Sequence, residues 1–134
     1  MEIKVFTESG RVPVTVLHVD GNIDAGTSDE FQQKAEELIK GGARHLLIDL
    51  SHVKFVSSAG LRAIHSLFNQ LRAFDPDSNL TEQEVKQGIS AGTYKSPHIK
   101  LLNPSPETRV SFETAGFDMF IQTHADMKTA VDSF

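Results

Sequence analysis

The sequence contains no cysteine. Disulfide bonds, thiolate catalysis and cysteine-ligated zinc sites are therefore excluded. Six histidines are present, but they show no HxxxH or comparable local ligand spacing, so the sequence nominates no metal-binding residue. A glycine-rich phosphate-binding loop ending in Lys-Ser or Lys-Thr is also missing, and no cofactor site is expected.

Long apolar runs and an excess of positive charge are missing as well. No run approaches the ~20 apolar residues that span a bilayer, and the N-terminus, with Glu2 and Lys4, lacks the apolar region of a signal peptide. The formal net charge of -5 offers no basic footprint for nucleic acid or an anionic membrane. We expect a cytoplasmic protein that binds neither nucleic acid nor membrane.

Segments typical of strands and helices alternate along the 134 residues, which fit one domain. The expected strands are residues 2–8, 11–19, 45–50, 98–102 and 119–123. Crossover connections between alternating strands and helices give a parallel sheet, and the turn signal Ser9-Gly10 adds an antiparallel hairpin at the N-terminus. The predicted fold is α/β, with a mixed, mostly parallel sheet and about four covering helices. The exposed edge of the hairpin is compatible with a monomer or a weak dimer.

The expected helices carry local start and stop signals. Thr27 and Glu30 predict a capping box for a helix that ends at Gly41-Gly42. Ser105, followed by Pro106, predicts another helix start. Residues 125–134 predict a last helix. Residues 75–97 carry only scattered large apolar side chains, and we interpret them as an exposed insertion, partly helical or mobile.

The stretch from Phe55 to Arg62 joins an apolar strand to an amphipathic helix. We interpret Ser57 as the N-cap of this helix, because a serine hydroxyl accepts a bond from an otherwise unpaired backbone N–H. Ser58 then falls in the first turn and points out of the corner. Free N–H groups and the helix dipole favour an added negative charge there by ~0.3–1 kcal/mol. The position is thus suited to carry a phosphate.

Several of these segments together resemble the STAS domain family, and within it the bacterial anti-sigma factor antagonists. The resemblance rests on Gly21-Asn22-Ile23-Asp24, residues 45–50, Phe55-Val56-Ser57-Ser58-Ala59-Gly60-Leu61 and Thr114-Ala115-Gly116-Phe117. It covers nearly the whole chain, residues 1–134, except the insertion at 75–97.

The resemblance implies a protein without catalytic activity that regulates transcription by partner switching. Such a protein binds an anti-sigma factor Ser/Thr kinase and frees the sigma factor that the kinase holds. The kinase phosphorylates the serine that maps onto Ser58, with Ser57 as the second choice, and a Ser/Thr phosphatase reverses the modification. The chain departs from many family members in having Ser57 instead of an aspartate before the modified serine, and Asn22 instead of a frequent glutamate.

Six residues are the predicted partner-binding site: Asp24, Ser57, Ser58, Ala59, Gly60 and Arg62. For three of them a second interpretation stays open. Asp24 either contacts the partner or stabilises its own loop. Gly60 allows close approach either to a neighbouring strand or to a partner. Arg62, one helical turn after Ser58, either pairs with a phosphate or is a solvated surface arginine.

Two other classes of function compete with this one. An enzyme with a serine nucleophile needs a base and an orienting group, but Ser57-Ser58-Ala59-Gly60 lacks the leading glycine of a nucleophile elbow and nothing nominates the base. A STAS scaffold or sensory module that is not phosphorylated, and that binds a nucleotide or a partner protein, is the main alternative. The intact serine at the helix start favours phospho-regulation.

Overall fold

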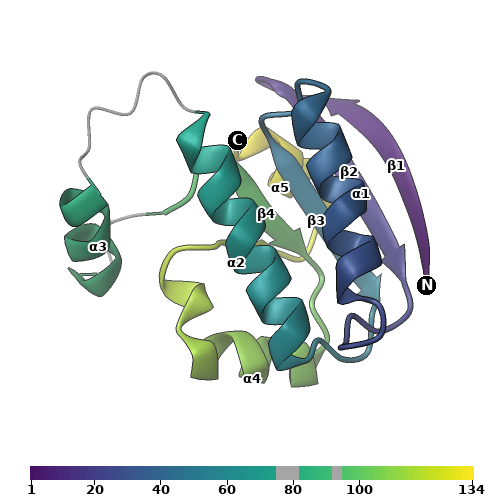
Figure 1. The fold of residues 1–134 in the computed structure, drawn as a ribbon. Coiled ribbons are helices and arrows are strands. Elements are labelled where there is room, and N and C mark those ends of the chain that lie inside the picture. The colour runs from purple at the N-terminus through teal and green to yellow at the C-terminus, as the bar shows by residue number, and fades with distance from the viewer. Residues whose placement is uncertain (75–81, 92–94) are drawn as a thin grey trace.

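The protein is built on a five-stranded sheet, with strands in the order β1-β2-β3-β4-β5 (Figure 1). The structure, a computed structural model, describes residues 1–74, 82–91 and 95–134. The strands are β1 (Glu2–Ser9), β2 (Pro13–Asp20), β3 (Leu46–His52), β4 (Ile99–Leu102) and β5 (Thr123–His124). β1 runs antiparallel to β2, and the other neighbouring strands are parallel. The predicted α/β fold with an antiparallel N-terminal hairpin is confirmed.

Helices lie on both faces of this sheet (Figure 1). They are α1 (Ser28–Lys40), α2 (Ser58–Ala73), α3 (Glu82–Ala91), α4 (Pro106–Ala115), the 3-10 helix η1 (Phe117–Met119) and α5 (Met127–Asp132). α1 and α2 pack side by side over one face, and α5 covers part of the other. Within the three described ranges, no helix is both long and apolar enough to cross a membrane.

The central strand β3 begins with three consecutive apolar residues instead of an alternating pattern. Leu46, Ile48 and Leu50 point into the larger core, which α1 and α2 cover, whereas Leu47 points into the smaller core beneath α5. All four side chains are fully buried. Both faces of a parallel strand are covered by crossover helices, so apolar residues are favoured on both faces, and the buried Asp49 is the exception in β3.

The last strand was predicted wrongly. A strand was expected at residues 119–123, but η1 occupies residues 117–119 and β5 contains only Thr123–His124. Gly116 ends α4 in the left-handed conformation at φ 78°, and the chain then tightens, with N–H groups of Phe120 and Ile121 both donating to the carbonyl of Phe117. Apolar residues that look like a strand by composition are therefore buried by a turn.

The predicted capping box at the start of α1 is also wrong. Thr27 is the N-cap residue, but its side chain makes no capping hydrogen bond. Its hydroxyl instead donates to the carbonyl of Asn22, at 2.7 Å, and accepts the N–H of Asp24, at 3.0 Å. The hydroxyl thus closes the preceding loop.

The insertion expected at 75–97 is described only in part. Residues 75–81 and 92–94 lie outside the described ranges, so its exposure as a whole stays a prediction. α3 forms within it, and Gln83 and Lys86 on this helix are exposed. At its far end Ser96 is buried. The Ser96 N–H donates to the carbonyl of Phe120, at 2.8 Å, so this end is tied to the rest of the domain.

Candidate functional site

The loop after β3 is held against the loop after β2. Ile23 and Val56 form an isolated parallel bridge. The Ile23 N–H donates to the carbonyl of Phe55, at 3.1 Å, and the Ser57 N–H donates to the carbonyl of Ile23, at 2.9 Å. The side-chain oxygen of Asn22 accepts the N–H of Phe55, at 3.1 Å. These bonds extend the parallel pairing beyond the strands and fix the start of α2.

Ser57 caps α2, as predicted from the sequence. Its backbone is extended, and its hydroxyl oxygen accepts the N–H of Gly60 at 3.4 Å. Its carbonyl accepts the N–H of Leu61 at 2.9 Å. Ser58 is therefore the first helical residue, and its side chain is exposed. The fully described first turn of α2 contains no acidic side chain, so the helix dipole there favours an anion without opposition from a carboxylate in that turn.

Gly60 lets α2 approach the β2–α1 loop closely. The residue is buried, and a Cβ at this position would lie 2.7 Å from both the carbonyl oxygen of Ile23 and the Cγ1 of Val56. Of the two interpretations of this glycine, close approach to a neighbouring segment is what the structure shows. A direct contact of Gly60 with a partner stays a prediction.

Asp24 stabilises the loop in which it lies. Its Oδ1 accepts the N–H of Gly26, at 2.9 Å, and lies 3.3 Å from the hydroxyl oxygen of Thr27. Its carbonyl accepts the N–H groups of Thr27 and Ser28. The loop-stabilising interpretation is thus confirmed, and a contact with a partner stays a prediction.

Ser58 lies beside an open apolar hollow between α2 and α4, which we call the α2–α4 hollow. Its lining residues are Phe55, Val56, Ser57, Ser58, Leu61, Val110, Ser111, Thr114 and Ala115. Phe55 is 44% exposed and Val110 59% exposed. A modified Ser58 would therefore place its charge at the rim of an accessible apolar surface.

Arg62 and His65 follow Ser58 along α2. Both line a second hollow together with Ser58 and Phe117. The His65 ring centroid is 5.9 Å from that of Phe117 and 6.1 Å from that of Phe68, so the histidine packs against aromatic rings. Arg62 is exposed and lies close enough to Ser58 to share one hollow with it. Ala59, the remaining predicted residue, is half-buried.

A model of the STAS domain family matches residues 5–75, more than half of the chain. The chain belongs to the STAS domain family. No curated protein matches it.

Solved structures of this STAS fold include three that cover almost the whole chain. An anti-sigma factor antagonist from Mycobacterium paratuberculosis has a TM-score of 0.65 at 21% identity, covering 96% of this chain and 91% of its own. The phosphorylated form of the Bacillus cell fate determinant SpoIIAA has a TM-score of 0.62 at 17% identity, covering 98% and 97%. An unphosphorylated form of SpoIIAA has a TM-score of 0.60 at 16% identity, covering 98% and 96%. At these sequence identities the structural similarity establishes that the chain shares the fold of these proteins.

The apolar lining of the α2–α4 hollow was not predicted as part of the site. The sequence of α4 contains a pattern that could have indicated this surface. Thr108 and Phe112, four residues apart, are buried. Val110 falls midway between them and so on the outer side of the helix. A valine on the solvent side of a short polar helix is the feature that would have pointed to this surface.

A polar cluster on the other face of the STAS sheet was also missed. His18 Nδ1 lies 2.8 Å from Asp49 Oδ2, and His18 Nε2 lies 3.2 Å from His52 Nδ1. The backbone N–H and the hydroxyl of Ser51 donate to Asp49 Oδ1. Burial opposes the charged carboxylate, but the bonds from Ser51 and His18 outweigh it, and the pKa of Asp49 is lowered. His18 and Asp49 are register partners on β2 and β3.

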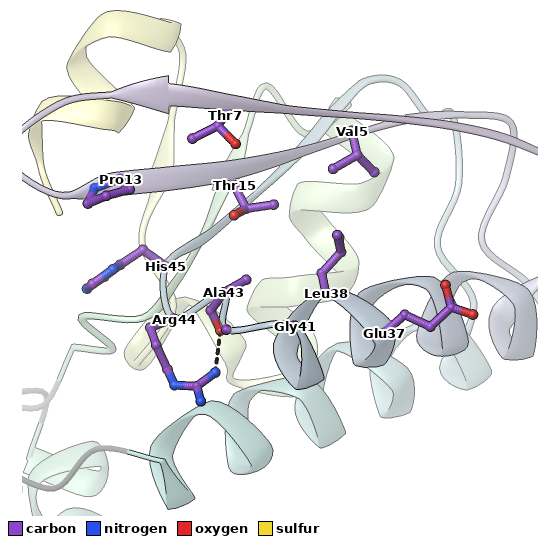
Figure 2. A pocket seen from close by; sticks show the side chains of 11 residues that line it. Val5, Thr7, Pro13, Thr15, Glu37, Leu38, Gly41, Ala43, Arg44 and His45 are labelled. Atoms are coloured by element: carbon purple, nitrogen blue, oxygen red, sulfur yellow. Dashed lines mark hydrogen bonds between the residues drawn. The ribbon is translucent and has the colours of Figure 1, made fainter.

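A further pocket lies between the hairpin and the C-terminal end of α1 (Figure 2). Val5 and Thr7 of β1 and Leu38 of α1 point toward it. Arg44 is beside it, but its guanidinium donates to the carbonyls of Ile39 and Ala43, each at 2.8 Å. The guanidinium therefore satisfies carbonyl groups at and just after the C-terminal end of α1, which have no partner within the helix.

Proposed function

We propose that this STAS domain is an anti-sigma factor antagonist that binds an anti-sigma factor Ser/Thr kinase and is switched off by phosphorylation of Ser58. In this role it regulates transcription in the bacterial cytoplasm and catalyses no reaction itself. The proposal is carried by one observation: Ser58 is exposed at the first position of α2, on the rim of the α2–α4 hollow. The shared fold with anti-sigma factor antagonists supports it.

The physical basis of the switch is a difference between the free and the docked surface. A phosphoserine adds about -1.5 to -2 charges. On the free protein the N–H groups at the start of α2 and the surrounding water solvate its oxygens. A partner seated over Phe55 and Val110 would strip water from the same group, and burying a charge that is not fully neutralised is strongly unfavourable. Phosphorylation therefore lowers affinity for the partner while the fold is kept.

Five of the six predicted residues divide between positioning and contact. Asp24 stabilises the β2–α1 loop, and Gly60 lets the start of α2 approach that loop closely. Ser57 holds the cap. Ser58 receives the phosphate, and Arg62 is placed to pair with it in a charge-assisted bond. A Ser/Thr phosphatase reaches the phosphoserine from solvent, because Ser58 is exposed.

Phosphate mapping tests the modified residue. The protein is incubated with ATP and a candidate anti-sigma factor kinase from the same cell, and the site is located by mass spectrometry. We expect label on Ser58 in the wild type and in Ser57→Ala, and none in Ser58→Ala. Label on Ser57 alone would reassign the site. A protein that no such kinase labels or binds would refute the proposal and favour the scaffold or sensory alternative.

A binding assay tests the surface. Val110→Gln should weaken kinase binding by about tenfold, since an apolar contact worth ~1.4 kcal/mol is lost at the interface. Met119→Gln is the matched control, because Met119 is also exposed, at 38%, and does not line the α2–α4 hollow. Ser58→Asp should weaken binding further. Equal effects of the Val110 and Met119 variants would place the contact elsewhere.

A further inference from the structure

The outer edge of β1 is a long strand edge. Among the described residues, β1 is the outermost strand of the sheet, paired with β2 on one side only (Figure 1). It is eight residues long, and Val5 and Phe6 at its centre are 37% and 39% exposed. An exposed strand edge of this length is a template for pairing with another strand.

The neighbouring strand shows which backbone groups of β1 point outward. The Thr15 N–H donates to the carbonyl of His45, at 2.8 Å, so Thr15 faces β3. Because directions alternate along a strand, Val16 faces β1, where its register partner is Phe6. The N–H and C=O groups of Phe6 therefore form hydrogen bonds with β2. The outward N–H and C=O groups of β1 belong to Val5, Thr7 and their alternate neighbours.

We propose that β1 pairs antiparallel with β1 of a second copy of this chain, with Phe6 opposite Phe6 on a two-fold axis. In this register Val5 lies opposite Thr7 of the second copy, so the outward groups of both residues meet and form hydrogen bonds. Lys4 lies opposite Glu8 of the second copy, and the two-fold axis repeats this pair of opposite charges. The two five-stranded sheets then join into one.

Charge selects this register over the other long one. Centring the pair on Val5 also matches outward groups, but it places Glu2 opposite Glu8 on both sides of the axis. Like charges directly opposite each other on a sheet are destabilising, and opposite charges contribute roughly 0.2–1 kcal/mol per pair. Charged residues usually protect strand edges from association. Here they favour association with the same edge in a single register.

A charge-swap series tests the register by sedimentation velocity across a wide range of concentration. We expect a dimer in the wild type, and dissociation constants raised about ten- to a hundredfold in Lys4→Glu and in Glu8→Lys, since each variant creates two repulsive pairs. The double variant should restore the dimer. Glu8→Lys is the more informative variant, because it makes the net charge of -5 less negative. The reduced overall repulsion between the two copies would by itself strengthen association, so weaker association must come from the local charge pairs. A wild type that stays monomeric throughout, or a double variant without rescue, would overturn the proposal.

Cross-linking gives an independent test, because the chain has no cysteine of its own. Across the proposed axis the Cα atoms of residue 6 lie about 4.5 Å apart, as in a non-hydrogen-bonded pair, within the usual span of a disulfide. Those of residue 5 lie diagonally, about 7–8 Å apart. Phe6→Cys should therefore form a disulfide dimer in a glutathione buffer, and Val5→Cys, of almost equal exposure, should not. Equal cross-linking of both variants would refute the register.

Discussion

Gly60 shows at the scale of one residue why the site has its shape. The start of α2 lies so close to the β2–α1 loop that a single methyl group would meet the carbonyl of Ile23 and the side chain of Val56 at 2.7 Å. The carbonyl of Ile23 already accepts the N–H of Ser57, so it cannot move without disturbing the cap. The position of Ser58 thus depends on the absence of a side chain two residues later.

Gly60→Ala should lower the free energy of unfolding by about 1–3 kcal/mol, the usual cost of overpacking. Urea denaturation measures the change. Gly41→Ala is the control, because its Cβ would meet only ordinary contacts at 3.5 Å and its φ is -77°. We expect that variant to be neutral or up to ~1 kcal/mol more stable. A Gly60 variant as stable as the control would contradict the close approach.

At the scale of elements, β2 and β3 are linked by side chains as well as by their backbone ladder. His18 on β2 and Asp49 on β3 form the link, and Ser51 completes the bonding of the carboxylate. Because the pKa of Asp49 is lowered in the folded protein, its charged form stabilises the fold. This contribution is present above the ordinary carboxyl pKa of about 3.9 and is lost as the pH falls through the folded value.

Asp49→Asn should therefore cost about 1–3 kcal/mol at neutral pH, because bonds to a charged, buried group are lost. The difference from the wild type should begin to shrink below about pH 4, where the unfolded carboxyl group is protonated, and should vanish once the pH falls below the lower pKa of folded Asp49. Urea midpoints at a series of pH values measure both effects. The control is Asp20→Asn, whose side chain is 59% exposed and should matter little. A difference in stability between the wild type and Asp49→Asn that stays constant with pH would argue against this account.

At the scale of the whole molecule, the proposed switch acts on binding and leaves the fold intact. Ser58 is exposed at a helix start, where a negative charge is favoured. Ser58→Asp should therefore keep the free energy of unfolding within about 0.5 kcal/mol of the wild type, although it weakens partner binding. Hydrogen exchange of α2 and β3 should also be unchanged. A variant that unfolds substantially more easily would mean that the charge acts through the fold.

The order of strands and helices, the cap at Ser57 and the place of Ser58 were predictable from the sequence. These features depend on side chains within a few residues of one another, because capping and periodicity are local. The misassigned segment at residues 119–123 shows the limit of that reasoning. Phe120 and Ile121 are buried, as a strand would require, but a turn after Gly116 buries them equally well.

What only the tertiary structure decided is the surroundings of Ser58 and the cluster at Asp49. The α2–α4 hollow joins Phe55 to Val110, and His18 reaches Asp49 because β2 and β3 pair in one register. These residues are far apart along the chain. The sequence by itself thus determined that the chain offers a capped serine at a helix start. Long-range packing decided which side chains surround that serine, because contacts between distant segments follow from sheet register and helix docking, which no local pattern encodes.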